Sequence, residues 1–154
     1  MDHAPARGGE AIPGRLRGPL TRSEQMARVR GRDTDPEMAL RRALWSEGIR
    51  YRLHARDLPG RPDLVFRSKR LAVFVHGCFW HRHNCPAGTR EPKSNQAFWR
   101  SKFEVNVARD ATVKDALEAS GWRVLAIWEC ELRRATQVRG AVDRVRQTLA
   151  EAAG

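Results

Sequence analysis

The sequence contains the run Val73-Phe74-Val75-His76-Gly77-Cys78-Phe79-Trp80-His81-Arg82-His83-Asn84-Cys85, in which an apolar strand leads directly into histidines, cysteines and two aromatic residues. The remaining cysteine ends a second apolar segment, which begins at Trp122. Four residues have the types and spacing of a closed tetrahedral zinc site: Cys78, His83, Cys85 and Cys130. We therefore expect a structural zinc ion that fixes an irregular loop to the end of a distant strand. The alternative is three buried, inert cysteines and a surface histidine.

Length and charge limit the class of protein. The chain has 154 residues, enough for one domain with a hydrophobic core. It carries 29 lysine and arginine residues against 18 acidic ones, a formal net charge of +11. This excess favours nucleic acid as a partner, although arginines that only coat a solvated surface would give the same composition. No apolar run is long enough to span a bilayer. Because three cysteines suit a reducing compartment, we expect a cytoplasmic, nucleoid-associated protein.

The order of expected elements indicates one folded domain after a tail. Residues 1–20, rich in Gly, Pro, Ala and Arg, are expected to form a disordered basic tail. A short helix is expected over about 21–30, and the capping-box pattern Thr34-Asp35-Pro36-Glu37 predicts a second helix that ends near residue 47. Strands are expected near 49–54, 63–66, 71–76 and 122–130, and further helices over about 98–120 and 138–151. This order indicates an α/β or α+β domain around one central sheet.

A second group of residues fits hydrolysis of a phosphodiester bond. Asp63 begins one strand of an expected hairpin and His76 ends the other, so a carboxylate and an imidazole can meet there. Asp63 and the backbone carbonyl of Val75 would bind magnesium, and His76 or His81 would act as the base. Glu37 would be a supporting carboxylate. Alone, Asp63 fits a turn and Glu37 fits a helix cap, so only the combination points to catalysis.

Three motifs resemble the very-short-patch-repair (Vsr) DNA mismatch endonucleases: Gly60-Arg61-Pro62-Asp63, the histidine- and cysteine-rich run that ends at Cys85, and the segment from Gly121-Trp122 to Trp128-Glu129-Cys130. The resemblance extends in order from about residue 21 to residue 135. It implies a restriction-endonuclease-like fold, with a central mixed sheet flanked by helices. It also implies that residues 21–154 form an endonuclease domain whose helix at 21–32 contacts DNA.

The resemblance further implies an activity, which is magnesium-dependent nicking of one DNA strand 5′ of the thymine in a T:G mismatch. Such mismatches arise when 5-methylcytosine deaminates. The family's metal-binding aspartate matches Asp63, its active-site histidines match His76 and His81, and its acidic helper matches Glu37. Its zinc ligands match the four residues found from spacing. One departure is Val75, which replaces a hydroxylic residue and serves equally well where the family uses the main-chain carbonyl.

Two kinds of residue are expected to bind DNA. In the family, aromatic residues at the positions of Phe79, Trp80 and Trp99 wedge into the base stack beside the mismatch, and Met26 could reach the minor groove. The other large aromatic residues are expected in the core: Phe98, Phe103, Trp122 and Trp128. Basic residues are expected to bind phosphates: Arg22, Arg28, Arg30, Arg32, Lys93, Arg100 and Lys102.

Two other functions fit parts of the sequence. One is a restriction-like nuclease of the same fold with a different sequence preference. The other is a catalytically inactive, zinc-stapled DNA-binding module, against which the full set of Glu37, Asp63, His76 and His81 argues. A nick in one strand at an asymmetric mismatch suits a monomer. An interaction with general mismatch-repair proteins is an expectation from the family alone.

Overall fold

The structure, a computed structural model, describes residues 33–151. The tail expected at 1–20 and the helix expected at 21–32 therefore lie outside the described residues. Within the described part the helices are α2 (Asp35–Ser46), α3 (Gln96–Ala119) and α4 (Ala135–Glu151), and the strands are β1 (Arg52–Leu53), β2 (Leu64–Phe66), β3 (Leu71–His76) and β4 (Arg123–Trp128). Short 3-10 turns follow β2 at Arg67–Lys69 and β4 at Glu129–Leu132.

The four strands form one mixed sheet in the order β1-β2-β3-β4. The first two pairings are antiparallel, and the expected hairpin is present with Phe66 opposite Leu71. The third pairing, β3 with β4, is parallel and runs in register from Leu71 opposite Arg123 to His76 opposite Trp128. Parallel neighbours need a crossover, which α3 supplies. The expected α/β architecture with a mixed sheet is thus confirmed.

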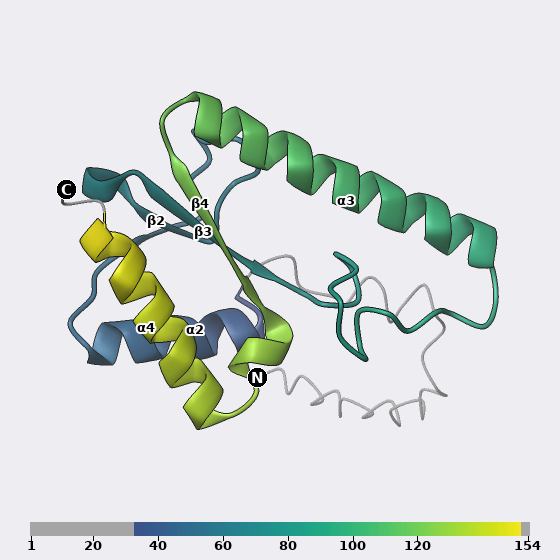
Figure 1. The fold of residues 1–154 in the computed structure, drawn as a ribbon, viewed down its shortest axis with the longest axis horizontal. Coiled ribbons are helices and arrows are strands. Elements are labelled where there is room, and N and C mark those ends of the chain that lie inside the picture. Colours follow the sequence, from purple (N-terminus) through teal and green to yellow (C-terminus); the bar gives the residue numbers. More distant parts are fainter. Residues whose placement is uncertain (1–32, 152–154) are drawn as a thin grey trace, which may run out of the picture. The chain divides into compact units, whose positions relative to one another are not determined.

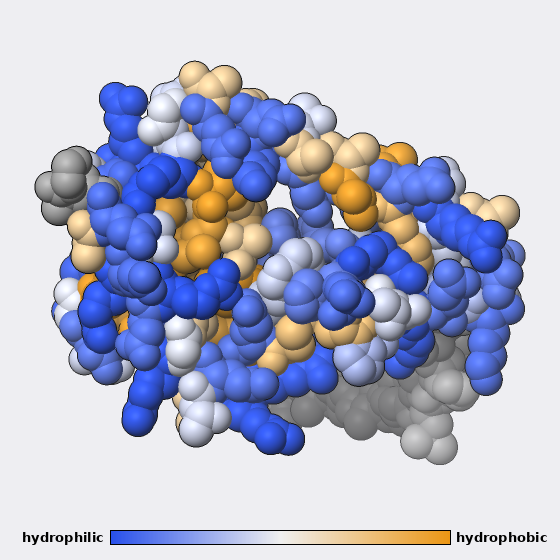
Figure 2. Space-filling view, viewed as in Figure 1, coloured by the Kyte–Doolittle hydropathy of each residue, from blue (hydrophilic) through white to orange (hydrophobic). Residues whose placement is uncertain are grey.

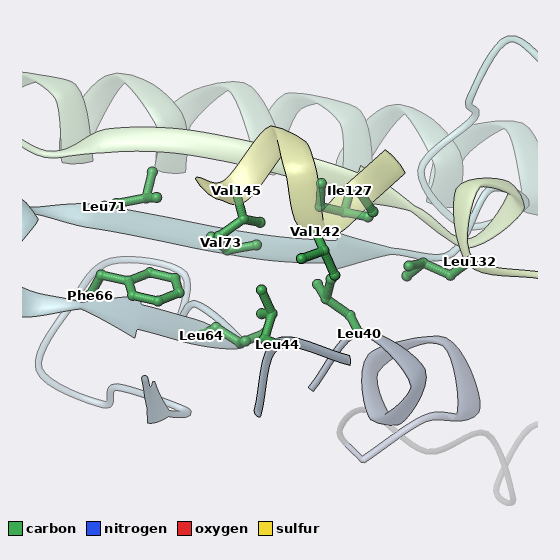
Figure 3. Close-up of a cluster of buried hydrophobic side chains, with 11 residues drawn as sticks. Leu40, Leu44, Leu64, Phe66, Leu71, Val73, Ile127, Leu132, Val142 and Val145 are labelled. Carbon is green, nitrogen blue, oxygen red and sulfur yellow. The ribbon is translucent and has the colours of Figure 1, made fainter. Parts of the chain in front are cut away.

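The core lies on both faces of the sheet because neighbouring residues of a strand point to opposite sides. On one face, Leu71 and Val73 of β3 join a cluster to which α2 and α4 contribute (Figure 3). On the other face, Ala72 and Phe74 pack with Leu117 of α3. Figure 1 accordingly shows α3 on one side of the sheet and α2 with α4 on the other.

The start of α2 follows the capping pattern with one change. The Thr34 side chain accepts the backbone N–H of Glu37 at 3.5 Å, and Pro36 lies in the first turn. The Glu37 carboxylate accepts the backbone N–H of Asp33 at 2.9 Å, one residue before the cap, where a capping box would bond the cap residue itself. Glu37 is therefore held at the helix start with its side chain buried, 1% exposed.

Three expectations about individual segments were wrong. The strand near 49–54 has only two residues, because His54 adopts a positive φ of 46° and leaves the strand. Phe98 is 60% exposed, whereas Trp99 is 7% exposed. Since residues four apart share a helix face, Trp99 turns inward with Phe103 and Phe98 cannot. Trp128, expected in the core, is half-buried and stacks on the His83 ring.

Hydrophilic side chains cover most of the face drawn in Figure 2, with smaller hydrophobic areas between them. The large apolar side chains left exposed include Trp45, Val105 and Val107. Among residues 33–151, no helix combines the length and the apolar character needed to cross a membrane.

The core packing predicts a difference between two helical positions. Leu44 of α2 is fully buried in the cluster of Figure 3, so Leu44→Ala should lower the free energy of unfolding by about 2–5 kcal/mol. Val107 of α3 is 46% exposed, so Val107→Ala should change it by less than about 0.5 kcal/mol. Urea unfolding followed by circular dichroism measures both. Equal losses would contradict the packing of α2 on the sheet.

Candidate functional site

Two clusters of polar side chains lie where β3 and β4 end. His76, the last residue of β3, is level with Trp128, the last residue of β4. The loop at 77–95 and the turn Glu129–Leu132 therefore start side by side at one end of the sheet, where β3 and β4 both finish. Because ligands of open α/β sheets gather at the carboxyl ends of strands, this edge is where the chemistry is expected.

Four cysteine and histidine side chains meet at this edge. Donor atoms of Cys78, His83, Cys85 and Cys130 all lie within 4.8 Å of one another. The sulfur of Cys130 is 3.5 Å from Nδ1 of His83, and the three cysteines are free thiols. Three sulfurs and one imidazole nitrogen are a donor set that suits zinc. These residues could hold a metal, and they are the set identified from sequence spacing.

The surrounding residues hold the four donors in place. The His83 ring stacks on Trp128, with ring centroids 4.3 Å apart. A Cβ at Gly88 would lie 1.9 Å from the carbonyl oxygen of His83, so only glycine fits there. The N–H of Gly88 donates to the sulfur of Cys85 at 3.4 Å and lowers the pKa of that thiol to about 7. Burial raises the pKa of Cys78 to about 12. The loop thus favours a thiolate at Cys85, the form that binds metals.

A second cluster contains two histidines and an aspartate. The rings of His76 and His81 are 4.1 Å apart between centroids, and Nδ1 of His81 lies 2.5 Å from a carboxylate oxygen of Asp110. Burial, and then the neighbouring His81, lower the pKa of His76 to about 4, so His76 is neutral at pH 7. Asp110 fixes Nδ1 of His81 as the protonated nitrogen and leaves Nε2 as the acceptor.

Sequence reasoning missed Asp110, although α3 carries a signal for it. Positions 103, 106, 110, 113 and 117 recur at helical spacing and form an inward stripe. Two of them are polar: Asn106, whose side-chain amide donates to the Trp80 carbonyl at 3.1 Å, and Asp110. Polar residues at positions where an apolar stripe is expected indicate partners in the loop that the helix covers.

Two further carboxylates lie near this site: Asp63, just before β2, and Glu37, in the first turn of α2. Asp63, one residue before β2, accepts the backbone N–H of Val75 at 2.7 Å. Burial raises the pKa of Asp63 to about 6, the Val75 N–H opposes this rise, and the charge of Glu37 adds to it. The structure thus brings Asp63 against Val75 and within electrostatic reach of Glu37. A buried carboxylate with a raised pKa lacks a compensating cation.

The residues expected to contact DNA fall into three groups: aromatic residues that are half-buried or buried, basic residues that are exposed, and residues outside the described part of the chain. Phe79 and Trp80 are half-buried and touch at 5.3 Å between centroids, whereas Trp99 is buried behind them, 6.0 Å from Phe79 and 5.9 Å from Trp80. The basic side chains at the start of α3 and just before it are exposed: Lys93, Arg100 and Lys102. The other expected contacts lie outside the described residues: Arg22, Met26, Arg28, Arg30 and Arg32.

Comparisons with known proteins agree on one family. A family model described as DNA mismatch endonuclease Vsr matches residues 17–87. The chain is 53% identical over 114 residues to the Type II nicking enzyme V.XorIIP of Xanthomonas oryzae, across 74% of this chain and 83% of the relative. It is 42% identical over 113 residues to the DNA mismatch endonuclease Vsr of Escherichia coli, across 73% and 72%. It is also 41% identical over 153 residues to the Type II nicking enzyme V.NaeI of Lentzea aerocolonigenes, across 95% and 88%.

The cysteine–histidine cluster predicts the metal content. Protein purified with thiol protection should carry one zinc ion per chain, and Cys130→Ala should lose most of it because a three-ligand site remains. The control is Asn84→Ala, an exposed position in the same loop. Elemental analysis measures the zinc, and thermal unfolding should show a lower Tm for Cys130→Ala alone. Wild-type protein without zinc would contradict the assignment.

Proposed function

This chain belongs to the Vsr family of DNA mismatch endonucleases, and from that premise we propose that it nicks one strand of duplex DNA, with Mg²⁺, 5′ of the thymine in a T:G mismatch. The observation that carries the proposal is the meeting of two groups near one sheet edge: Asp63 against Val75, and His76 beside the His81–Asp110 pair. The proposal includes a restriction-endonuclease-like fold, zinc as the ion of the cysteine cluster, and a monomer that works with general mismatch-repair proteins.

Asp63 and the backbone carbonyl of Val75 are the residues that would hold Mg²⁺. A buried carboxylate with a raised pKa fits a hard cation, because the cation supplies the missing positive charge. When bound, Mg²⁺ neutralises charge on the scissile phosphate and lowers the pKa of bound water. The N–H of Val75 orients the Asp63 carboxylate because it donates to one oxygen, Oδ2, and leaves the other oxygen for a ligand.

His81 is the proposed general base. Its Nδ1 is held by Asp110, so Nε2 can take the proton of the attacking water, and the Asp110 carboxylate stabilises the imidazolium that forms. His76 stays neutral because its pKa is low, so it does not carry a positive charge in this cluster. Its ring lies against His81 and Trp128, and one ring N–H can donate to a phosphate oxygen.

The aromatic cluster of Phe79, Trp80 and Trp99 is proposed to sense the mismatch. Unstacking a base step costs a few kcal/mol and less where the pair is defective, and stacking on an aromatic ring returns about 1–3 kcal/mol per base. Phe79 and Trp80 are the half-buried members, and buried Trp99 supports them from behind. Because Trp99 is only 7% exposed, its proposed part in DNA binding is indirect, through the rings of Phe79 and Trp80 that it supports. Lys102 and Arg100 lie on the same helix and can bind the flanking phosphates.

The second candidate function is a nuclease of this family with a different sequence preference. It is favoured by relatives named as Type II nicking enzymes. An inactive DNA-binding module is less consistent with the geometry, because the His81–Asp110 pair and the Asp63–Val75 contact have no evident use in binding alone.

The decisive experiment is strand-specific nicking of an end-labelled duplex with one T:G mismatch, in several flanking contexts, with Mg²⁺. Fully paired T:A and C:G duplexes are run beside it. Wild-type protein should make one cut 5′ of the mismatched thymine, and Asp63→Ala should abolish the cut while binding persists. Asp57→Ala, an exposed aspartate on a salt bridge to Arg67, should cut normally. Cutting of paired DNA would favour the second candidate, and binding without any cut would favour the inactive module.

The His81–Asp110 pair predicts a separate effect on rate. Asp110→Asn keeps the side-chain shape but removes the charge that orients and stabilises the imidazolium, so kcat should fall about 100-fold or more. Mismatch binding, measured by gel shift, should be unchanged. Asp115→Asn, an exposed aspartate of the same helix, is the matched control. If Asp110→Asn cuts at the wild-type rate, His81 is not the base that Asp110 orients.

A further inference from the structure

Three side chains that have no part in the proposed reaction lie around Glu37: Asp33, Arg41 and His54. Asp33, Glu37 and Arg41 are four residues apart and lie on one side of the start of α2, and His54 reaches them from the end of β1. Arg41 Nη1 is 2.7 Å from Asp33 Oδ1 and 3.8 Å from Glu37 Oε1. The group is close to the candidate metal ligand, since His54 donates its backbone N–H to the carbonyl of Asp63 at 3.2 Å.

Glu37 is the buried member of the group, and one of its oxygens needs a partner. Oε2 accepts the N–H of Asp33. Oε1 is buried and has no hydrogen bond from any residue in the described part of the chain. Two side-chain nitrogens lie close to Oε1: Nε2 of His54 at 3.3 Å and Nη1 of Arg41 at 3.8 Å. Burying a carboxylate oxygen without a hydrogen-bond partner costs free energy. We therefore expect the position of Oε1 to depend on the neighbouring His54 side chain.

The backbone of His54 is shaped for this contact. Its φ of 46° lies in the left-handed region, which histidine adopts more readily than most side chains. The turn ends β1 and directs the imidazole toward two carboxylates: Nε2 forms a hydrogen bond with Oδ1 of Asp33 at 3.4 Å and lies 3.3 Å from Oε1 of Glu37. His54 thus joins two parts of the site: its main chain holds the segment of Asp63, and its side chain meets Glu37.

We propose that His54 is a positioning residue whose imidazole fixes the Glu37 carboxylate beside Asp63. The inference rests on the proposed function, with Glu37 in the role of acidic helper that the family resemblance implies. The side chains of Asp33, Glu37 and His54 are also close enough to surround a metal ion. Arg41 already supplies a positive charge 2.7 Å from Asp33, which disfavours a second cation there and leaves the imidazole as the side chain in contact with Oε1.

The test compares two substitutions that separate the imidazole from the backbone turn. His54→Gly removes the side chain and accepts the positive φ without strain, whereas His54→Gln restores a neutral donor of similar reach. His54→Gly should lower kcat about tenfold to hundredfold, because Glu37 Oε1 then loses its contact with Nε2 of His54, and leave KM for mismatched DNA nearly unchanged. His54→Gln should recover most of the loss. Leu53→Ala, the exposed neighbour on β1, should match wild type.

A double-mutant cycle shows whether His54 acts through Glu37. In a Glu37→Gln background, His54→Gly should lower kcat by less than about a further twofold, because the partner it positions is already neutral. Thermal unfolding of every variant identifies any that fail to fold. A His54→Gly protein that cuts at the wild-type rate, or losses that multiply in the double mutant, would overturn the inference while wild-type nicking still supports the function. Wild-type protein that fails to nick T:G duplexes would overturn both.

Discussion

The parallel pairing of β3 with β4 is the constraint on which the rest of the site depends. It sets His76 level with Trp128, so the loop after one strand and the turn after the other start at the same edge. Cys78 and Cys130 are far apart in sequence, yet this register alone brings their segments together. The pairing also needs a crossover, and α3 fills that role while it places Asp110 against His81. One set of backbone hydrogen bonds therefore positions both the loop that carries the cysteine–histidine cluster and the two histidines proposed for catalysis.

The clusters at this end of the sheet differ in how burial and hydrogen bonds shift their pKa values. In the cysteine cluster a backbone N–H lowers the pKa of Cys85, while burial raises the pKa of Cys78 and of Cys130. The clusters around Asp63 and His76 are left uncompensated: burial raises the pKa of Asp63 and lowers that of His76. Both shifts favour the neutral forms of these side chains, as is expected at a site that binds charged ligands. A phosphate with its cation supplies both signs of charge at once.

Much of the fold could be predicted from the sequence because its signals are local. Hydrophobic periodicity indicated α2, α3, α4 and the hairpin, and cysteine spacing indicated the cluster of Cys78, His83, Cys85 and Cys130. What escaped prediction depends on tertiary contacts. Asp110 belongs to the site only because α3 crosses over the loop, and His54 only because its turn directs it to Glu37. Trp99 and Phe98 exchanged places, since adjacent residues of a helix cannot face the same way and the sequence does not state which one turns inward.

The inward stripe of α3 has a consequence for how this enzyme can vary. One helix packs Leu117 on the sheet, offers Asp110 to His81, and supports the aromatic cluster through Phe103 and Trp99. Each residue of a helix turns by about 100° and rises about 1.5 Å. Insertion or deletion of a single residue between Phe103 and Leu117 would turn the two parts of the helix by about 100° relative to each other. The inward residues of one part would then no longer face the same side as those of the other part. Length changes are accommodated more easily before or after α3, because this helix fixes the distance and rotation between the sheet and the loop at 77–95.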